Sequence, residues 1–410
     1  MNVLHINNTD LTGARFNGHD MQIELNKRGI PTKQIVMDKR GNNANTLKLI
    51  NDFEEPALRN MCIEYETKTS VQSLVYPYGW RLLEHPEFKK ADIVHYHLIH
   101  NRLLSLTSLP DLFRAKPSIY TIHDSWIFSG HCVHSLGCDK WKTGCGGCPD
   151  LNISFKMEKD NTNMMWNIKK ETLSKQNFDI VVASQYMLKM VKESPITQNN
   201  QNIHLIPFGI NLELFTQNRK REEVRKSFGI PPDSFVIFFR SDIWEFKGLD
   251  VIKNMLDILK PSKSVVLFTV GHNDLLTDYK EKYTIMQKGW VNNEELMAQF
   301  YCACDVFLMP SWAEAFGLMA IETMASSRPI IVMDGTSLPD VTFAPDCGIS
   351  IKRGDAVAMK EAIERLMQNP DECKVRGQKG RELAEKHYRF EDYIDRHLKL
   401  YESILARGKD

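Results

Sequence analysis

The stretch Met309-Pro-Ser-Trp-Ala-Glu314-Ala-Phe-Gly-Leu-Met-Ala-Ile-Glu322 joins a short apolar run to an Ala- and Met-rich helical segment. The run 306–309 that leads into it has the continuous apolar character of a buried parallel strand. Gly317 opens the helical segment, and a residue without a Cβ suits a place where a ligand approaches the backbone closely. In a doubly wound sheet, ligands bind at the carboxyl ends of strands, where helix N-termini offer N–H groups to phosphate. The stretch therefore predicts a phosphate-binding strand–loop–helix unit in an α/β fold.

Short apolar runs alternate with helical patterns along the whole chain, which indicates parallel sheets covered by helices on both faces. The chain has 410 residues, more than one typical core accommodates, so two domains are expected. We expect Rossmann-like domains at 1–207 and 208–387, with a C-terminal helix at 388–410 that packs back onto the first. The predicted strands are 3–7, 34–37, 93–97, 118–122 and 180–183 in the first half, and 235–239, 265–270, 306–309 and 330–333 in the second.

Two further segments differ in how clearly their pattern can be interpreted. The segment from Arg40 to Pro86 shows no regular periodicity and gives no assignment. The final stretch is amphipathic at helical spacing. Its predicted apolar face consists of Phe390, Ile394, Leu398, Tyr401 and Leu405.

Composition excludes several classes of protein. The 52 basic and 52 acidic residues cancel, whereas nucleic-acid binders carry a basic excess, so no nucleic-acid partner is expected. No segment approaches the roughly 20 apolar residues that span a bilayer. The N-terminus Met1–Ile6 has the pattern of a first strand rather than of a signal peptide. We therefore expect a cytoplasmic protein, with peripheral contact at the inner face of the membrane left open.

Glu314 and Glu322 lie at the two ends of the opening stretch. Glu314 comes just before the predicted helix and Glu322 about two turns into it, and eight helical residues span roughly 12 Å. That length is of the order of a diphosphate held between a sugar and a ribose, and carboxylates accept hydrogen bonds from hydroxyl pairs. The alternative for a single Glu is an ordinary surface or helix-start residue, which the helix dipole favours.

Glu-x7-Glu followed by Thr323-Met-Ala325 resembles the donor motif of retaining glycosyltransferases with the GT-B fold, in family four. The resemblance extends over nearly the whole chain and includes bacterial capsule and exopolysaccharide enzymes of the colanic-acid type. It implies two domains facing across a cleft and a UDP- or GDP-sugar donor. The acceptor would be a hydroxyl of a saccharide or lipid-linked saccharide. In such a site Glu314 would hold the donor sugar and Glu322 the ribose, and the helix start at Phe316, Gly317 and Leu318 would bind the diphosphate.

Several smaller motifs support this resemblance. Arg240 and Lys247, in Phe239-Arg-Ser-Asp-Ile-Trp-Glu-Phe-Lys-Gly248, could converge on the diphosphate, although Phe239 stands where the family usually has Gly. Their alternative is a pair of solvated surface charges. The turn Lys288-Gly-Trp-Val291 resembles the base-binding turn, in which backbone groups near Val291 would contact the nucleobase.

The N-terminal half contributes two candidate positions. Gly13 and Ala14 follow the first strand and could present N–H groups to the transferred phosphate. His123, at the end of Tyr120-Thr-Ile-His-Asp124, matches the family's active-site histidine, which contacts the donor sugar. His97 and Asn101 follow another strand, where contact with the acceptor is weighed against a purely structural role.

Four of the nine cysteines lie in one short segment: Cys132, Cys138, Cys145 and Cys148. Four thiolates suit tetrahedral Zn²⁺, and the neighbouring glycines let the chain wrap an ion. Four protein ligands leave no open position, so the zinc would be structural. Iron–sulfur ligation, metal-free thiols and disulfides are the alternatives, and His131 or His134 could replace one thiolate.

The expected chemistry is sugar transfer with retention and without a catalytic metal. Arg240, Lys247 and the helix N-terminus would stabilise the departing diphosphate. The leaving phosphate could accept the proton of the acceptor hydroxyl. Two alternatives stay open: a sugar-nucleotide 2-epimerase of the same architecture, and an inactive zinc-braced scaffold.

Overall fold

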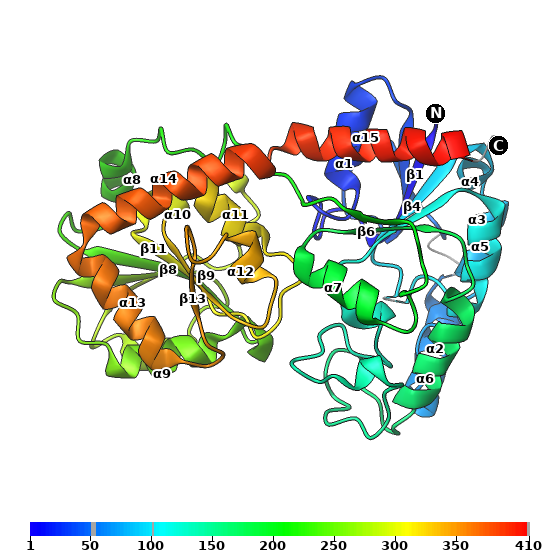
Figure 1. Cartoon of the computed structure of the whole chain (residues 1–410), viewed down its shortest axis with the longest axis horizontal. Helices are drawn as coiled ribbons and strands as arrows, with labels where there is room; N and C mark the ends of the chain where they lie inside the picture. The colour runs from blue at the N-terminus through cyan, green and yellow to red at the C-terminus, as the bar shows by residue number, and fades with distance from the viewer. Residues whose placement is uncertain (51–54, 101, 408–410) are drawn as a thin grey trace. The chain divides into compact units, whose positions relative to one another are not determined.

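The computed structural model of the chain describes residues 1–50, 55–100 and 102–407 (Figure 1). It divides into two compact units. Unit 1 consists of Met1–Ile206 and Tyr393–Asp410, and unit 2 of Pro207–Asp392. Asn101, one of the positions considered for the acceptor, lies outside the described residues. Within the described ranges, no helix combines the length and the apolar character that crossing a membrane requires.

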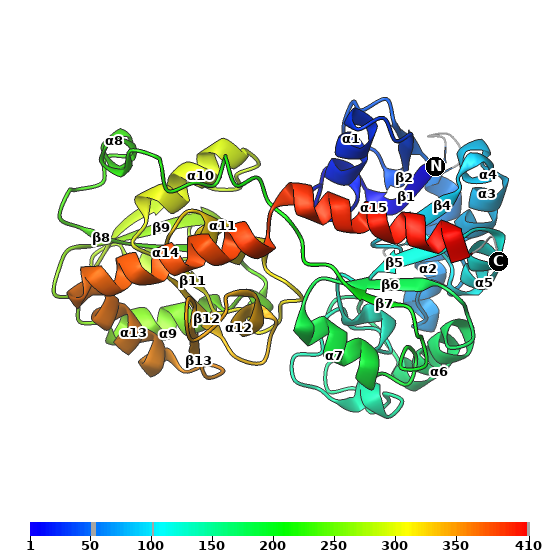
Figure 2. The same cartoon turned by 45° about the horizontal axis from the view of Figure 1, so that its top comes forward.

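Unit 1 is built on a seven-stranded sheet in which every neighbouring pair is parallel, in the order β3-β2-β1-β4-β5-β6-β7 (Figure 2). The central strands are buried on both faces, which explains their continuous apolar sequences. The strands are β1 (Val3–Thr9), β2 (Thr32–Asp38), β3 (Thr46–Lys48), β4 (Ile93–Tyr96), β5 (Ser118–Thr121), β6 (Asp179–Val182) and β7 (Ile203–Leu205).

Unit 2 has a six-stranded parallel sheet in the order β10-β9-β8-β11-β12-β13. Alternate residues of its first strand face opposite layers. Phe235, Ile237 and Phe239 pack with α9 and α13, while Phe238 contacts Phe300 and neighbouring aromatic rings on the other face. The strands are β8 (Phe235–Ser241), β9 (Val265–Gly271), β10 (Thr284–Gln287), β11 (Val306–Met309), β12 (Ile330–Met333) and β13 (Ile349–Ile351).

Helices connect most pairs of successive strands and cover both faces of each sheet (Figure 1). In unit 1 they are α1 (His19–Lys27), α2 (Glu55–Thr69), α3 (Tyr78–Glu84), α4 (Pro86–Lys90), α5 (Leu109–Ala115), α6 (Thr162–Leu173) and α7 (Gln185–Glu193). In unit 2 they are α8 (Arg221–Ser227), α9 (Leu249–Ile258), α10 (Glu294–Ala303), α11 (Leu318–Ala325), α12 (Leu338–Val341), α13 (Ala356–Gln368) and α14 (Pro370–His387).

The last helix, α15 (Phe390–Arg407), begins in unit 2 and continues into unit 1. In unit 1 the Tyr401 hydroxyl lies 2.8 Å from His95 Nδ1 on β4 and 3.2 Å from Met21 Sδ on α1. The helix is confirmed, but its predicted face is only partly right, because Leu398 and Leu405 are not fully buried. The buried face consists of Tyr393, Ile394, His397, Leu400, Tyr401 and Ile404.

All nine predicted strands are confirmed, and four short edge strands were not predicted. The unpredicted strands are β3, β7, β10 and β13, each of three or four residues. The described parts of the irregular segment from Arg40 to Pro86 contain β3 and the helices α2 and α3, and α4 begins at its last residue.

Candidate functional site

In unit 2 the sheet reverses its direction of growth between β8 and β11. From β8 the chain adds β9 and β10 on one side, and then β11, β12 and β13 on the other. Loops that leave the carboxyl ends of two such strands turn away from each other and leave a crevice, which is the usual ligand site of an open α/β sheet. Arg240 lies at the end of β8, the loop after β8 carries Lys247, and the loop after β11 carries Glu314. The topology therefore gathers three of the predicted residues at one sheet edge.

Lys247 and Glu314 meet at this point, with Lys247 Nζ 3.0 Å from Glu314 Oε2. Their side chains are 20% and 17% exposed, so both remain accessible to a ligand. A partly exposed ion pair contributes little to stability. The pair instead holds a cation and a carboxylate side by side at a position accessible to solvent.

Backbone contacts hold the two loops together. The Trp312 N–H donates to the Phe246 carbonyl at 2.9 Å. Gly248 has a left-handed backbone (φ +76°), and a Cβ there would collide with the Pro310 carbonyl oxygen. The Gly at this position is therefore required by the close approach of the two loops, which in turn places Lys247 beside Glu314.

Gly317 is the N-cap of α11 and has φ +98°. A Cβ at this position would lie 2.6 Å from Leu338 Cδ2, so only glycine fits. The first N–H groups of a helix have no acceptor within the helix, and they carry the positive end of its dipole. The helix starts at Leu318, as the sequence predicts, and this end of α11 can accept an anion.

Glu322 lies in the buried part of α11, with none of its surface exposed. The Tyr301 hydroxyl donates to Glu322 Oε2 at 2.7 Å. The structure therefore places Glu322 in a polar contact inside unit 2, apart from the Lys247–Glu314 pair. A ribose hydroxyl could reach this carboxylate only if the side chains that cover it moved.

Arg240 takes a different partner from Lys247. Its Nη2 lies 2.6 Å from Asp242 Oδ2, and its guanidinium lies 4.6 Å from the ring centroid of Trp290. His272 contacts the same Trp290 ring edge-on and the same carboxylate, with Nδ1 3.4 Å from Asp242 Oδ1. Trp290 is 57% exposed. An exposed aromatic ring beside a guanidinium offers a flat surface on which a planar ligand can stack.

Asp242, His272 and Trp290 are residues that sequence reasoning missed. They come from the loops after β8, β9 and β10, which are neighbours in the sheet. The turn before Val291 is held there, because the Lys288 N–H donates to Thr269 and the Gly271 N–H to Gly289. All three loops leave the same sheet edge. The tryptophan in the predicted base-binding turn is therefore the sequence feature that could have identified this group of residues.

In unit 1 the corresponding reversal lies between β1 and β4. The loop after β1 contains Gly13, with φ +74°, and Ala14. The Ala14 N–H donates to the Leu11 carbonyl at 3.2 Å, and the Phe16 ring occupies the space a Cβ on Gly13 would enter. The Ala14 amide is therefore used inside the turn, and a phosphate would have to displace that bond.

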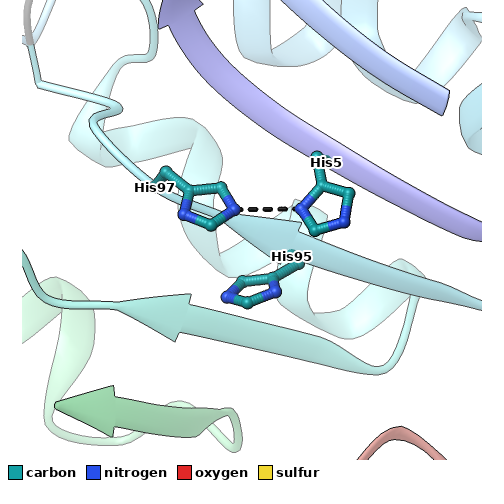
Figure 3. A group of neighbouring side chains, drawn as sticks. All are labelled: His5, His95 and His97. Carbon is teal, nitrogen blue, oxygen red and sulfur yellow. Dashed lines mark hydrogen bonds between the residues drawn. The ribbon is translucent and has the colours of Figure 1, made fainter. Parts of the chain in front are cut away.

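A column of histidines fills the same switch point (Figure 3). His5 Nδ1 lies 3.0 Å from His97 Nε2, and His97 Nδ1 lies 3.2 Å from His123 Nε2. His95 stacks on His97, with ring centroids 4.3 Å apart. Burial lowers the pKa of His5 to about 3 and that of His123 to about 4, and it holds the pKa of His95 and His97 well below the usual range. These rings are therefore neutral near pH 7.

The geometry of this column does not suit a metal ion. Nitrogen atoms of His5, His95 and His97 lie within 4.8 Å of one another. The planes of His95 and His97 are only 25° apart, however, so their in-plane lone pairs run side by side and do not converge. His95 also uses both nitrogens, with Tyr401 and Thr121. The column is a hydrogen-bonded stack.

The stack has a direction, because a neutral imidazole carries one N–H. Within the described residues, His5 Nε2 is buried and has no hydrogen-bond partner. Donation can run from His5 through His97 to His123, or in the reverse sense. The first order places the last N–H on His123 Nδ1 and the second places it on His5 Nε2, and both nitrogens are buried.

Asp124 shapes the loop that follows His123. Its Oδ1 accepts from the Trp126 N–H at 2.9 Å and caps the turn Ser125–Ile127, and its Oδ2 lies 3.3 Å from His100 Nε2. The cysteine segment begins a few residues later. The buried Lys169 ammonium on α6 donates to the Trp126 and Ser129 carbonyls, at 2.5 and 2.8 Å, and so fixes the start of that segment.

The four cysteines of this segment line one small cavity of about 30 Å³. All four are present as free thiols. The Gly130 N–H donates to Cys145 Sγ at 3.2 Å, and His131 Nε2 lies 3.4 Å from Cys148 Sγ. The segment thus brings thiols that are up to 16 positions apart in the sequence to the lining of one cavity, although no three of these four sulfur atoms lie within 4.8 Å of one another. They are Cys132, Cys138, Cys145 and Cys148.

Comparison with known proteins places these features in a family. Residues 220–383 match the family model described as glycosyl transferases group 1. The range contains Arg240, Lys247, Glu314 and Glu322. An uncharacterized 41.2 kDa protein in the cps region of Klebsiella pneumoniae is 27% identical over 238 residues, which is 56% of this chain and 63% of that protein. The capsular polysaccharide biosynthesis glycosyltransferase CapM of Staphylococcus aureus is 25% identical over 242 residues, with the same coverage.

The chain thus spans less than two thirds of the length of these curated relatives. The fold is supported over a longer range. The structure of Anabaena Alr3699/HepE in complex with UDP and glucose superposes with a TM-score of 0.69 at 12% identity, and covers 98% of this chain and 100% of that one. The chain therefore has the GT-B fold, and its residues 220–383 match the glycosyl transferases group 1.

Proposed function

We propose that the protein transfers a sugar from a nucleoside diphosphate sugar to a hydroxyl of a saccharide or glycolipid acceptor, with retention at the anomeric carbon. The family match and the relatives from capsule synthesis favour a role in bacterial surface polysaccharide synthesis. Because HepE was crystallised with UDP, a UDP-sugar is the first donor to test, followed by a GDP-sugar. A lipid-linked acceptor would bring the protein to the cytoplasmic face of the membrane.

The observation that carries this proposal is the Lys247–Glu314 pair at the switch point of unit 2. Transfer requires a cation beside the leaving diphosphate and an acceptor of hydrogen bonds beside the sugar hydroxyls. Lys247 and the N-terminus of α11 fill the first role, and Glu314 fills the second. Arg240 adds charge from the end of β8, while Trp290 offers a surface on which the base can stack.

On unit 1, His123 would contribute a neutral hydrogen-bonding group to the donor sugar. A charged imidazolium would compete with Lys247 for the diphosphate, whereas a neutral imidazole forms a hydrogen bond with a hydroxyl group without that cost. No side-chain base is needed if the leaving phosphate accepts the acceptor proton, and no catalytic metal enters this scheme.

The test is a release-and-transfer assay over a panel of UDP- and GDP-sugars, with and without saccharide acceptors. Wild type should release nucleoside diphosphate from one donor class, and an acceptor should accelerate that release. NMR of the product reports whether the anomeric configuration is retained. Absence of turnover and of any thermal stabilisation by nucleotides would overturn the proposal.

We also propose that Cys132, Cys138, Cys145 and Cys148 hold a structural zinc ion. The donor chemistry fits, since one cavity of about 30 Å³ is lined by all four thiols. No three of the four sulfurs lie within 4.8 Å of one another, so binding of the ion would have to draw them together. The Gly130 N–H at Cys145 Sγ is the kind of hydrogen bond that orients a thiolate ligand. The ion would brace the loop that follows His123 and Asp124.

Metal analysis of the purified protein tests this proposal directly. We expect about one zinc per chain, lost in Cys145→Ser and kept in Cys62→Ser, because Cys62 lies outside the segment. Thermal unfolding of the zinc-loaded and chelator-treated protein should differ by several °C. A metal-free wild type with unchanged melting after zinc addition would contradict it.

A further inference from the structure

Unit 2 has a second pocket, at the opposite edge of its sheet from the Lys247–Glu314 pair. Its volume is about 640 Å³. Phe235 and Asp305 line it where β8 and β11 begin, and Pro329 lines it just before β12. Because a strand rises about 3.3 Å per residue, the length of β8 puts this edge on the order of 20 Å from the carboxyl ends. The pocket is therefore separate from the candidate donor site.

The pocket has an excess of positive charge in a chain whose formal net charge is zero. Two acidic side chains line it, Asp233 and Asp305. Five cationic side chains line the same space: Arg221, Arg225, Lys263, Arg328 and Lys374. The five cations therefore exceed the carboxylates available inside the pocket.

Asp305 is already committed to partners. Its two carboxylate oxygens pair with Arg221 and Arg225, the latter at 2.5 Å, and one of them also accepts from the Val236 N–H at 2.7 Å. Arg225 itself is buried and donates to the Ala303 and Ser234 carbonyls. This network fixes one wall of the pocket, and its two ion pairs neutralise the charge of Asp305.

Arg328 is compensated less completely. Within residues 1–50, 55–100 and 102–407, no carboxylate lies within 4 Å of its guanidinium, so Asp305 acts on it only at longer range. Its Nε is buried without a hydrogen-bond partner. Burial lowers the pKa of Arg328, and the neighbouring Arg221 lowers it further. A largely buried guanidinium next to a second guanidinium is costly unless an anion joins them. Gln378 lines the same space and can donate further hydrogen bonds, whereas the Ser327 hydroxyl already donates to Gln217 Oε1 at 3.0 Å.

We propose that this pocket binds the phosphate groups of an anionic ligand, with Arg328, Lys263 and Lys374 as its main contacts. A guanidinium fork beside two ammonium groups matches a phosphate dianion, and the volume is within the range of small-molecule sites. The group could belong to a soluble phosphorylated compound or to an anionic lipid headgroup. The inference goes beyond the proposed transfer reaction and does not depend on it.

The test uses pyrophosphate as probe, titrated calorimetrically into the full chain at low ionic strength. We expect Arg328→Gln to weaken binding about tenfold, which corresponds to about 1.4 kcal/mol. Lys280→Gln, an exposed cation of unit 2 outside the pocket, is the matched control and should bind like wild type. The comparison between these two variants isolates this pocket from any binding beside Lys247.

If Arg328→Gln does not fold, the double variant Lys263→Gln/Lys374→Gln replaces it, because both side chains are exposed. Equal pyrophosphate affinity in this double variant and in Lys280→Gln would overturn the proposal. So would calorimetry of wild type that detects no binding outside the donor site.

A second arm distinguishes the two sources of phosphate. Sedimentation with phosphatidylglycerol vesicles, compared with phosphatidylcholine vesicles, measures headgroup binding. Pelleting that the pocket variants lose and Lys280→Gln keeps would assign the site to a lipid headgroup. Binding of pyrophosphate without pelleting would assign it to a soluble ligand, and the absence of both would overturn the proposal.

Discussion

The two switch points share one sheet topology but differ in the charge and exposure of their side chains. In unit 2, the loops after β8 and β11 bring together charged side chains that solvent reaches, Lys247 and Glu314. In unit 1, the strand ends of β1, β4 and β5 lead into a stack of buried neutral imidazoles, with His97 at its centre. Both places have the same topological origin, a sheet that grows outward from its first strand in two directions.

The difference suggests how charge would be divided in the proposed transfer. A departing diphosphate would need cations, and Lys247 and Arg240 lie in the region that matches the family model. A sugar hydroxyl would need a hydrogen-bonding group that does not attract the diphosphate, which is the role we propose for His123. Four predictions can break or sharpen this comparison.

The largest expected effect comes from removing the cation. Lys247→Ala should lower kcat of the proposed transfer by about 10²–10³, because one charge-stabilising contact in a transition state is worth about 3–4 kcal/mol. Steady-state kinetics measures this, with Lys280→Ala as the control on the same unit. A variant that keeps its melting temperature and full kcat would remove Lys247 from the site.

The histidine stack should make unit 1 sensitive to acid. Folded-state pKa values of about 3 for His5 and about 4 for His397 lie below the unfolded value, so the unfolded chain binds more protons between pH 6.5 and 4. Stability is therefore complete above pH 6.5 and falls with pH through this window, by about 1.4 kcal/mol per unit of pKa shift.

Thermal unfolding recorded from pH 7.5 to 4 measures this loss. Replacement of His397 by Phe should flatten the curve. A melting temperature that stays constant between pH 6.5 and 4.5 would contradict the neutral stack.

Breaking the centre of the stack should alter His123 without unfolding the unit. His97→Phe removes both hydrogen bonds, so His123 Nε2 loses the partner that selects one tautomer of its ring. We expect a mixture of His123 tautomers in ¹⁵N NMR and a fall in kcat of about tenfold. His97→Asn, which keeps a polar group near the Nδ1 position, should restore part of both. An unchanged His123 spectrum in His97→Phe would show that the stack does not orient it.

The smallest expected effect concerns the exposed ring beside Arg240. Trp290→Ala should raise KM for the donor roughly fivefold and change kcat little, because stacking on an exposed aromatic contributes about 1 kcal/mol. Trp80→Ala, an exposed Trp of unit 1, is the matched control. A fall in kcat with constant KM would place Trp290 closer to the reacting atoms than the base.

The buried strands could be predicted from sequence because they are continuously apolar, whereas the edge strands could not. Ile203-His-Leu205 and Thr46-Leu-Lys48 have three residues each and mix polar with apolar side chains, since one side of an edge strand meets solvent. The α15 face was misplaced for a related reason. Tyr393 and His397 were not counted as core residues, yet both are buried, and His397 Nδ1 pairs with the Tyr393 carbonyl.

The Lys247–Glu314 contact follows from the sequence once β8 and β11 are recognised as neighbours. The Tyr301–Glu322 bond does not, because it depends on the packing of α10 against α11. One feature of the sequence could have predicted the histidine stack. His95 and His97 are two positions apart on one strand, so they share a face, and His5 lies opposite His95 in the parallel register.

Helix α15 gives unit 1 a discontinuous chain, and this has a consequence for synthesis. His95 and Met21 contact Tyr401, and Tyr401 is synthesised only after the whole of unit 2. At typical translation rates, roughly 10–40 seconds separate the end of the first segment from the arrival of the helix. During that interval the face of β4 that α15 later covers is open to chaperones, and unit 2 can finish folding before the unit that precedes it in the sequence.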